Sequence, residues 1–348
     1  FTHNIVSLTD SVNLTLGLRY VDERKRGGLV SSTGSNPNCA GAGGANPTVC
    51  NPVFTPASET TLYDLYPNAK FEDEAFTYVV GLALQLDEDS LLYASVSEGF
   101  KSGGLNLDIT GTGSSDPTFE SEEVLAYEIG VKTKLASDRV IANLSIFHME
   151  IDDFQLLTFS GTAFSVFNVD KAESSGVELD VDAQVADNLI VDASLVYNDA
   201  SFPSDCASAS APPTAHLQCG KDLPNAPEFV AVLGADWTLS LGQDVELVLT
   251  PNARYESRSQ PATFQPSYKQ DSTTVIDLRA SFQSKDERFS VEVWGKNLTD
   301  EGKLTRAFDT ISNLIAPPSP PAAAQTSGSL SSWVIDPRTY GVTFRSKF

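Results

Sequence analysis

Hydrophobic and polar residues alternate along most of this chain with a period of two. Val12, Leu14 and Leu16 are separated by Asn13 and Thr15. The same pattern recurs further on, for example in 177–185, 245–249 and 289–293. Because successive side chains of a β-strand point to opposite faces, each such segment has one apolar and one polar face. The pattern therefore predicts a chain built from half-apolar β-strands.

The connections between these segments differ in length at the two strand ends. At one end the turns are short and polar, near 87–89, 136–138, 186–188, 241–243 and 285–287. At the other end they are long, roughly at 27–70, 105–120, 203–225, 259–270 and 300–336, with one short connection near 160–164. A soluble β-sandwich would also alternate, but this asymmetry is typical of bacterial transmembrane barrels, whose long loops are extracellular.

The pattern gives about thirteen strands, and we expect residues 1–348 to form one domain, an all-β transmembrane antiparallel β-barrel. The expected strands lie near 1–9, 11–25, 72–87, 89–104, 121–136, 138–159, 165–186, 188–203, 226–241, 243–258, 271–285, 287–299 and 337–348. Many exceed the ~9–11 residues that cross a membrane and should extend beyond it on the loop side. Bacterial single-chain barrels have even strand numbers, so the odd count predicts that further strands precede Phe1.

Composition argues against two other classes of protein. Hydrophobic residues make up 41% and charged residues 20% of the chain, and the mean hydropathy is -0.13. No apolar run approaches the ~20 residues of a transmembrane helix. The net charge of -23 disfavours nucleic acid as a partner, because phosphate binding needs clustered Lys and Arg. The acidity could lie on solvated loops or in the lumen, and the sequence leaves this open.

The four cysteines form two close pairs within expected loops. Cys39 and Cys50 lie in one long loop, and Cys206 and Cys219 lie in another. Pairing within each loop closes a short segment at low entropic cost and suits an oxidising extracellular location. Metal binding is the alternative, but His216 is the one histidine near any of these cysteines. We therefore expect two disulfides and no metal site.

Aromatic residues also gather near the loop-side strand ends. They are Tyr20, Phe100, Phe119, Phe159, Phe202, Phe229 and Tyr255. Such a band is typical of the girdle that a barrel places at a membrane interface. The alternative is that these are ordinary strand aromatics, which β-propensity also favours.

Five segments, in order, make the chain resemble the TonB-dependent outer-membrane receptors. The first is Leu92–Asn106, which contains Gly-Phe-Lys-Ser-Gly-Gly, and the second is Asn168–Leu179, which contains Lys-Ala and later Gly-Val-Glu. The others are Pro224–Phe229, with Asn-Ala-Pro, Val293–Asp300, with Asn-Leu-Thr-Asp, and the final strand Pro337–Phe348. In the second segment, Gly176 is expected where a side chain would crowd a neighbouring strand or a bend.

The resemblance implies more than the residues alone do. It implies a 22-stranded barrel that holds an N-terminal plug, of which this chain would be the C-terminal portion without the plug. It implies contact with the TonB system through the missing N-terminal part, residence in the bacterial outer membrane among lipid and lipopolysaccharide, and an extracellular small-molecule cargo. The alternating Tyr340, Val342, Phe344 and terminal Phe348 resemble the signal that the barrel-assembly machinery reads.

No motif in the chain indicates catalysis. The His-Glu-x-x-His, Gly-x-Ser-x-Gly, Gly-x-Gly-x-x-Gly and Walker patterns are absent. We therefore expect a protein that is not an enzyme and carries no cofactor. Haem cargo would usually need loop histidines as axial ligands, and His216 is the one histidine in an expected loop.

The expected function is active uptake of a scarce solute, with a ferric siderophore or similar iron chelate as the family default. Candidate cargo-contacting residues at the loop side are Arg24, Lys25, Arg26, Lys101, Arg254, Tyr255, Arg258 and Tyr268. Arg and Tyr suit anionic chelates, although contact with lipopolysaccharide phosphates or simple solubility explains them equally well. One alternative is a passive porin-like channel without a plug, and another is a non-transport role as a surface adhesin or scaffold. A third is uptake of vitamin B12, carbohydrate or haem, because the fold does not fix the cargo.

Overall fold

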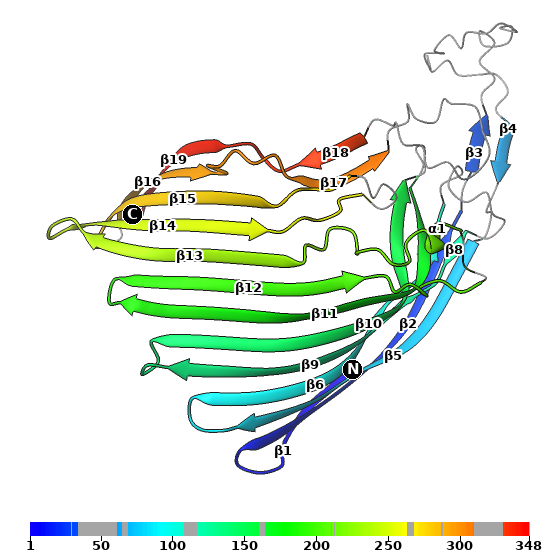
Figure 1. Cartoon of the computed structure of the whole chain (residues 1–348), viewed down its shortest axis with the longest axis horizontal. Coiled ribbons are helices and arrows are strands. Elements are labelled where there is room, and N and C mark those ends of the chain that lie inside the picture. Colours follow the sequence, from blue (N-terminus) through cyan, green and yellow to red (C-terminus); the bar gives the residue numbers. More distant parts are fainter. Residues whose placement is uncertain are drawn as a thin grey trace, which may run out of the picture.

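A single 13-stranded antiparallel sheet forms most of the molecule, in agreement with the expected strand count (Figure 1). The computed structural model describes residues 1–28, 30–33, 61–64, 69–107, 117–159, 164–209, 211, 213–262, 268–286, 288–309 and 330–347. Cys39, Cys50 and Phe348 lie outside the described residues.

Each strand of the sheet pairs with the next long strand along the chain. The strands are β1 (Thr2–Ser7), β2 (Val12–Gly27), β5 (Ala69–Gln85), β6 (Ser90–Lys101), β9 (Glu122–Leu135), β10 (Val140–Phe159), β11 (Phe164–Ala186), β12 (Leu189–Ser201), β13 (Phe229–Ser240), β14 (Val245–Glu256), β15 (Thr273–Ser284), β16 (Phe289–Lys296) and β19 (Thr339–Ser346). Figure 1 shows the short turns gathered at one edge and the long connections at the other, which confirms the predicted asymmetry.

The long connections contain short elements that the alternating pattern does not predict. They are three hairpins, β3 (Val30–Thr33) with β4 (Thr61–Asp64), β7 (Gly104–Leu105) with β8 (Thr118–Phe119), and β17 (Leu304–Asp309) with β18 (Leu330–Val334), and one helical turn, α1 (Pro213–His216). In the part of the chain that the structure describes, no helix has the length and apolarity needed to cross a membrane.

The strand register sorts side chains onto two faces. Leu82, Ala94, Ile129, Ile146 and Val177 are successive cross-strand partners and form an apolar row. We call this side the outer face. It remains exposed, as at Ile129 and Ile146, because no second layer of protein covers it. The alternate positions carry residues such as Glu128, Ser145 and Glu178, and form the inner face of the curved sheet.

Buried apolar packing is concentrated beside the sheet, at its loop side. Leu156 and Val169, from β10 and β11, pack with residues of the β12–β13 connection, including Phe202, Cys206 and Ala215. Cys206 is bonded to Cys219, which confirms the second predicted disulfide. A sheet with no covering layer cannot form a core of its own, so the folded loop provides one.

The expected aromatic girdle is partly correct. Tyr20 and Phe76 are partners with ring centroids 4.9 Å apart on the outer face, and Phe229 lies 6.1 Å from Tyr255. Phe202 is only 1% exposed because it belongs to the loop core, so its assignment to the girdle is wrong. Phe119 is also not a girdle residue, because its ring packs on Gly104 in a loop hairpin.

Candidate functional site at the loop-side mouth

A loop segment crosses the inner face of the sheet at its loop side. It consists of residues 102–107 and 117–121, between β6 and β9, and we call it the strap. Its first anchor is Lys25 on β2, whose Nζ donates to the Gly103 carbonyl at 2.6 Å and to Ser102 Oγ at 3.1 Å. Leu107 packs where a side chain on Gly27 would otherwise lie.

The other side of the strap is bonded to β11. Asn106 Nδ2 donates to the Val166 carbonyl at 2.7 Å, and the Val166 N–H donates to Asn106 Oδ1 at 2.8 Å. Glu120 and Asn168 form a second reciprocal pair, with both distances 2.9 Å. The strap therefore joins two parts of the wall, β2 and β11, that are not neighbours in the sheet.

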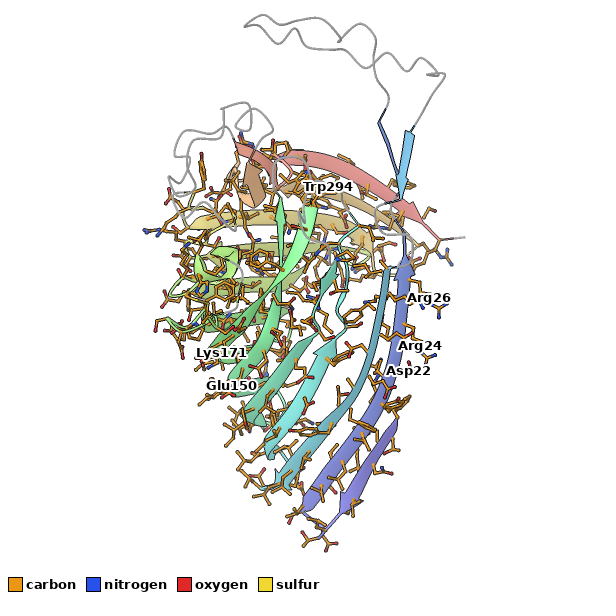
Figure 2. The ribbon with its side chains drawn as sticks, turned by 90° about the vertical axis from the view of Figure 1, so that its right-hand side faces the viewer. Asp22, Arg24, Arg26, Glu150, Lys171 and Trp294 are labelled. Carbon is orange, nitrogen blue, oxygen red and sulfur yellow. A yellow bond between two sulfur atoms is a disulfide. The ribbon has the colours of Figure 1, made fainter. Side chains whose placement is uncertain are left out.

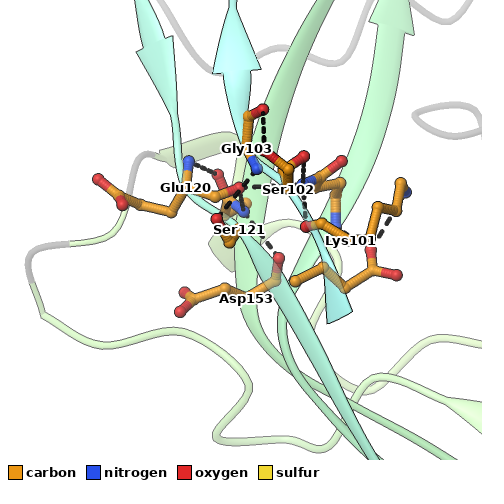
Figure 3. A network of polar contacts seen from close by, with 9 residues as sticks. Lys101, Ser102, Gly103, Glu120, Ser121 and Asp153 are labelled. Carbon is orange, nitrogen blue, oxygen red and sulfur yellow. Dashed lines mark hydrogen bonds and ion pairs between the residues drawn. The ribbon is translucent and has the colours of Figure 1, made fainter. Parts of the chain in front are cut away.

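Gln155 on β10 bonds to both ends of the strap, in the polar network of which Figure 3 labels Lys101, Ser102 and Glu120. Its Nε2 lies 3.1–3.2 Å from the carbonyl oxygens of Lys101, Ser102 and Glu120. Its backbone N–H donates to the Glu122 carboxylate at 2.7 Å. One side chain thus holds both ends of the strap where they leave the strands.

Glycine is required where the strap turns away from β6. A Cβ atom on Gly103 would lie 2.3 Å from the Phe119 carbonyl oxygen and 2.4 Å from the Phe71 ring. Since real Cβ atoms do not approach backbone so closely, any side chain here would displace the strap. Close packing is thus one reason that Gly follows Lys-Ser in this segment.

Asp153 occupies an unusual backbone position beneath the network. Its φ is 54°, in the left-handed region that Asp tolerates better than most residues. Its carbonyl accepts a hydrogen bond of 2.7 Å from Asn168 Nδ2. Burial raises the pKa of the Asp153 carboxyl, and the nearby carboxylates of Asp170 and Asp152 raise it further.

A hollow of about 570 Å³ opens at the same side between the ends of β12 and β14. Its cationic groups are Arg258 and Lys269, and Tyr255 contributes to its wall. Its lining also includes the carboxylates of Asp199, Asp222, Glu228 and Asp271. The hollow can therefore offer charges of both signs to a polar solute.

Glu256 anchors the far side of this mouth. It accepts a hydrogen bond of 2.6 Å from Arg254 Nε and another from Lys303 Nζ, which ties the β16–β17 connection to β14. Burial alone would raise the pKa of Glu256, but the hydrogen bonds from Lys303 and Arg254 outweigh it and hold the pKa below its ordinary value.

The structure separates the predicted cargo-contacting residues into groups. Lys25 and Lys101 lie on the inner face beside the strap, and Lys101 also pairs with Glu122 at 3.4 Å. Arg258 lines the hollow, Arg254 is engaged by Glu256, and Tyr268 precedes the lining residue Lys269 in the chain. Tyr255 also borders the hollow, but its register with Ala231, Leu195 and Leu179 places it on the outer face of the sheet. Arg24 and Arg26 project from the opposite, outer face of β2 (Figure 2).

Sequence reasoning missed the residues that build the strap. Gln155, Asn106 and Asn168 carry no charge and match no catalytic pattern. The sequence did contain one indication of these residues, because Asn168 and Lys101–Gly104 lie in two of the five family-like segments. In the structure the two segments are linked through Glu120, which bonds to Asn168, and Gln155, which bonds to Ser102 and Glu120. No group of three His, Cys, Asp or Glu residues within the described ranges is arranged to hold a metal ion.

Comparison with known proteins places these features in context. Residues 1–298 match the family model for the TonB dependent receptor-like β-barrel. The ferric yersiniabactin uptake receptor FyuA from Yersinia pestis has 18% identity and a TM-score of 0.72, with 98% of this chain and 44% of that one covered.

Two further solved structures are similar over the same extent. The siderophore receptor PiuA from Acinetobacter baumannii has 17% identity and a TM-score of 0.65, with 98% of this chain and 41% of that one covered. The copper transporter OprC has 15% identity and a TM-score of 0.65, with 98% and 46% covered. The chain thus spans less than half the length of these three proteins, and at such identity the likeness shows the fold alone.

Proposed function

This chain belongs to the TonB-dependent receptor family, and from that premise we propose that it forms the wall and ligand-binding mouth of a receptor for active uptake of a scarce solute. The protein resides in the bacterial outer membrane, as the family and its structural relatives do. The apolar outer face of the sheet then contacts lipid, and the loop side is extracellular.

The strap is the observation that best supports a receptor. It crosses the inner face at the extracellular side, and Lys25, Gln155 and Asn168 hold it against three separate strands. A segment fixed across the mouth narrows the route into the lumen, whereas a passive pore gains from an open one. The adjacent hollow offers a solute its first contacts.

For the cargo we propose a ferric siderophore or similar iron chelate. Many such chelates are anionic, and Arg258 and Lys269 can donate to their oxygens. FyuA and PiuA are both receptors for siderophores, which supports this choice by analogy alone. A cationic or neutral cargo would instead use the carboxylates of the hollow, such as Asp199 and Asp271.

Uptake of radiolabelled iron tests the proposal. The full-length receptor would be expressed in a strain without its own siderophore receptors and supplied with catecholate, hydroxamate or phenolate iron chelates. We expect uptake of one class that disappears when TonB is deleted. Uptake that persists without TonB would refute the energy-coupled mechanism, and no uptake of any chelate would refute the iron assignment.

A cargo-site variant sharpens the test. Arg258→Ala with Lys269→Ala should weaken binding of an anionic chelate about a hundredfold or more, because hydrogen bonds to charged groups are each worth ~1.5–3 kcal/mol and ~1.4 kcal/mol is a factor of ten. Arg139→Ala with Arg288→Ala removes the same charge at the short-turn end and should leave uptake unchanged. Stronger uptake by the hollow variant would indicate a cationic cargo.

Two partners belong to this proposal. The first is the TonB system, which would supply the energy for uptake. The second is the barrel-assembly machinery, for which Tyr340, Val342, Phe344 and Phe348 would form the recognition signal. Its support is that Tyr340, Val342 and Phe344 share the outer face of β19 and are 66%, 71% and 68% exposed.

A further inference from the structure

A tight turn of residues 297–300, which we call the Asn297 turn, follows directly after β16 at the loop side of the sheet. It belongs to the fourth family-like segment, and it lies outside both the strap and the hollow. From this turn the chain runs through β17 and β18 before it returns as β19, the partner of β16 (Figure 1). The turn therefore stands at the base of a long connection between two paired strands.

A long connection leaves open the register of the two strands that it joins. At the short-turn end of the sheet, a tight turn fixes which residues face each other. Between β16 and β19 the connection covers residues 297–338. Alternation does not supply the missing information, because a slip of β19 by two residues keeps Tyr340, Val342 and Phe344 on the outer face. Other contacts must therefore hold β19 in the observed register.

The Asn297 side chain ties the start of the connection to its end. The residue is only 4% exposed, and its φ of 49° turns the chain away from β16. Its Oδ1 accepts hydrogen bonds from the Glu301 N–H at 2.9 Å and from Thr299 Oγ1 at 3.3 Å. Its Nδ2 donates to the Glu301 carbonyl at 2.9 Å and to the Asp336 carbonyl at 3.0 Å. One amide group thus uses its acceptor on the turn and a donor on the far end of the connection.

Asp300 and Arg338 form a second tie beside the first. Asp300 also has a positive φ, 59°, and its carboxylate accepts hydrogen bonds from the Arg338 N–H at 3.1 Å and from Nη2 at 3.3 Å. Arg338 Nη1 donates to the Leu298 carbonyl at 3.3 Å. Because Arg338 immediately precedes β19, these bonds fix the point at which that strand begins.

The Asn297 turn is itself anchored to β15. The Asn297 N–H donates to the Asp277 carboxylate at 2.7 Å. The Leu298 N–H donates to the Ile276 carbonyl, also at 2.7 Å. The turn is therefore fixed to the sheet on one side, and the residues that lead into β19 are fixed to the turn on the other.

We propose that the Asn297 turn is a register clamp for β19. It supplies, for a long connection, the positional information that a tight turn supplies for a short one. All of its partners precede residue 339, so the clamp can form before β19 pairs with β16. A two-residue slip would move every partner of β19 by about 7 Å along the strand, and the clamp opposes it. This inference concerns assembly of the sheet and is independent of the proposed uptake function and of any cargo.

Trp294 opposes the same slip from within the strands. It faces Gly341 in the observed register and would face Thr339 or Thr343 after a slip by two residues. This pair constrains the middle of β19, whereas the clamp constrains its beginning. The variants described next leave Trp294 and Gly341 in place, so any slip that they cause is due to the clamp.

Disulfide trapping in the full-length receptor tests the clamp from the opposite end of the strands. Ser290 faces Arg345 in the observed register, and a two-residue slip would bring Thr343 or Lys347 opposite Ser290 instead. With the clamp intact, Ser290→Cys should form a disulfide with Arg345→Cys, but not with Thr343→Cys or with Lys347→Cys. Mass spectrometry of peptides from isolated outer membranes identifies the trapped pair.

Asn297→Gly with Arg338→Ala removes the side-chain ties and retains a residue that accepts a positive φ. The fraction trapped by a slipped pair should rise at least about tenfold, since each lost hydrogen bond shifts such an equilibrium about fivefold. The matched control is Asn225→Gly with Arg139→Ala. Asn225 has a φ of 59°, and Arg139 pairs with Asp187 at 3.4 Å, both away from β16 and β19. The control should trap the observed pair alone.

Trapping of the observed pair alone in the clamp variant would overturn the proposal, and so would equal slipping in the control. Asn297→Asp gives the answer if the double variant does not assemble. It keeps the acceptor oxygen but loses the donors to the Glu301 and Asp336 carbonyls. We expect an intermediate slipped fraction, and a register as uniform as that of wild type in Asn297→Asp would count against the clamp.

Discussion

The indole ring of Trp294 occupies the space that a Cβ atom on Gly341 would need. The two residues are direct partners across β16 and β19, and such a Cβ would lie 2.1 Å from the ring. The indole N–H donates to Thr343 Oγ1 at 3.2 Å, so the ring is held along the last strand. Two other inner-face pairs, Tyr93 with Gly130 and Phe147 with Gly176, are built the same way, which confirms the crowding expected at Gly176.

Gly341→Ala should therefore destabilise the closing strand. The added methyl group forces the indole off its place and strains the pairing of β16 with β19, at a cost of about 1–3 kcal/mol. Chemical unfolding of the receptor in detergent, followed by tryptophan fluorescence, measures the change. Gly99→Ala is the control, because its Cβ would lie 3.8 Å from Val124. Equal stability of the two variants would contradict this role of the glycine.

Gln155→Ala should release the strap from the wall. The change leaves the carbonyls of Lys101, Ser102 and Glu120 without their shared donor. Removing a buried or part-buried partner costs about 1–3 kcal/mol, so amide hydrogen exchange in the strap should speed up roughly tenfold or more. Gln85→Ala, which removes a similar donor at the short-turn end, should leave exchange in the strap unchanged. An unchanged strap in Gln155→Ala would show that the network does not hold it.

Loss of the Cys206–Cys219 disulfide should loosen the extracellular loop but not the sheet. The bond closes a loop with a sequence separation of 13, and a constraint of that size contributes about 3 kcal/mol. In Cys206→Ala with Cys219→Ala, protease cleavage should begin within the β12–β13 connection, while the sheet keeps its β-type circular dichroism. Cleavage at wild-type rates would show that the apolar core of Phe202, Leu156 and Val169 is sufficient alone.

The Glu256 carboxylate should stabilise the folded mouth at pH values above the range in which it titrates. Its folded-state pKa is lowered, so its contribution is present above the ordinary glutamate pKa of about 4.3 and is lost as pH falls through the lower folded value. Thermal unfolding at a series of pH values between about 3 and 6 should therefore show a decline at low pH that is smaller in Glu256→Gln. Identical pH profiles for the two proteins would argue against this coupling.

Asp153 should affect the pH dependence of stability in the opposite direction to Glu256. Its folded-state pKa is raised, so its contribution to stability is complete below the ordinary aspartate pKa of about 3.9 and is lost as pH rises through the folded value. Asp153→Asn removes the charge and retains a residue that accepts a positive φ. We expect the variant to be more stable than wild type at neutral pH, with the difference vanishing in acid. Lower stability at neutral pH would mean that the carboxylate has a partner it needs.

The sequence alone determined the strands, because a period of two has only one regular backbone solution. It also determined the unequal ends of the sheet, through short polar turns and long connections, and the family, through five ordered segments. It even contained the orientation of Arg24 and Arg26. Counting by two from Tyr20 places Arg24 and Arg26 on the outer face, whereas Lys25 between them falls on the inner face.

Only the tertiary structure decided which distant residues meet. The contacts of Gln155 with Lys101, Ser102 and Glu120 depend on a loop folding back onto the inner face, and no local period encodes that path. For the same reason Phe119 and Phe202 could not be told from girdle residues, since alternation stops where the strands end. The alternation that predicts strands depends on residues that are neighbours along the chain. The arrangement of the mouth depends instead on the curvature of the sheet, which brings β2, β10 and β11 within reach of one strap.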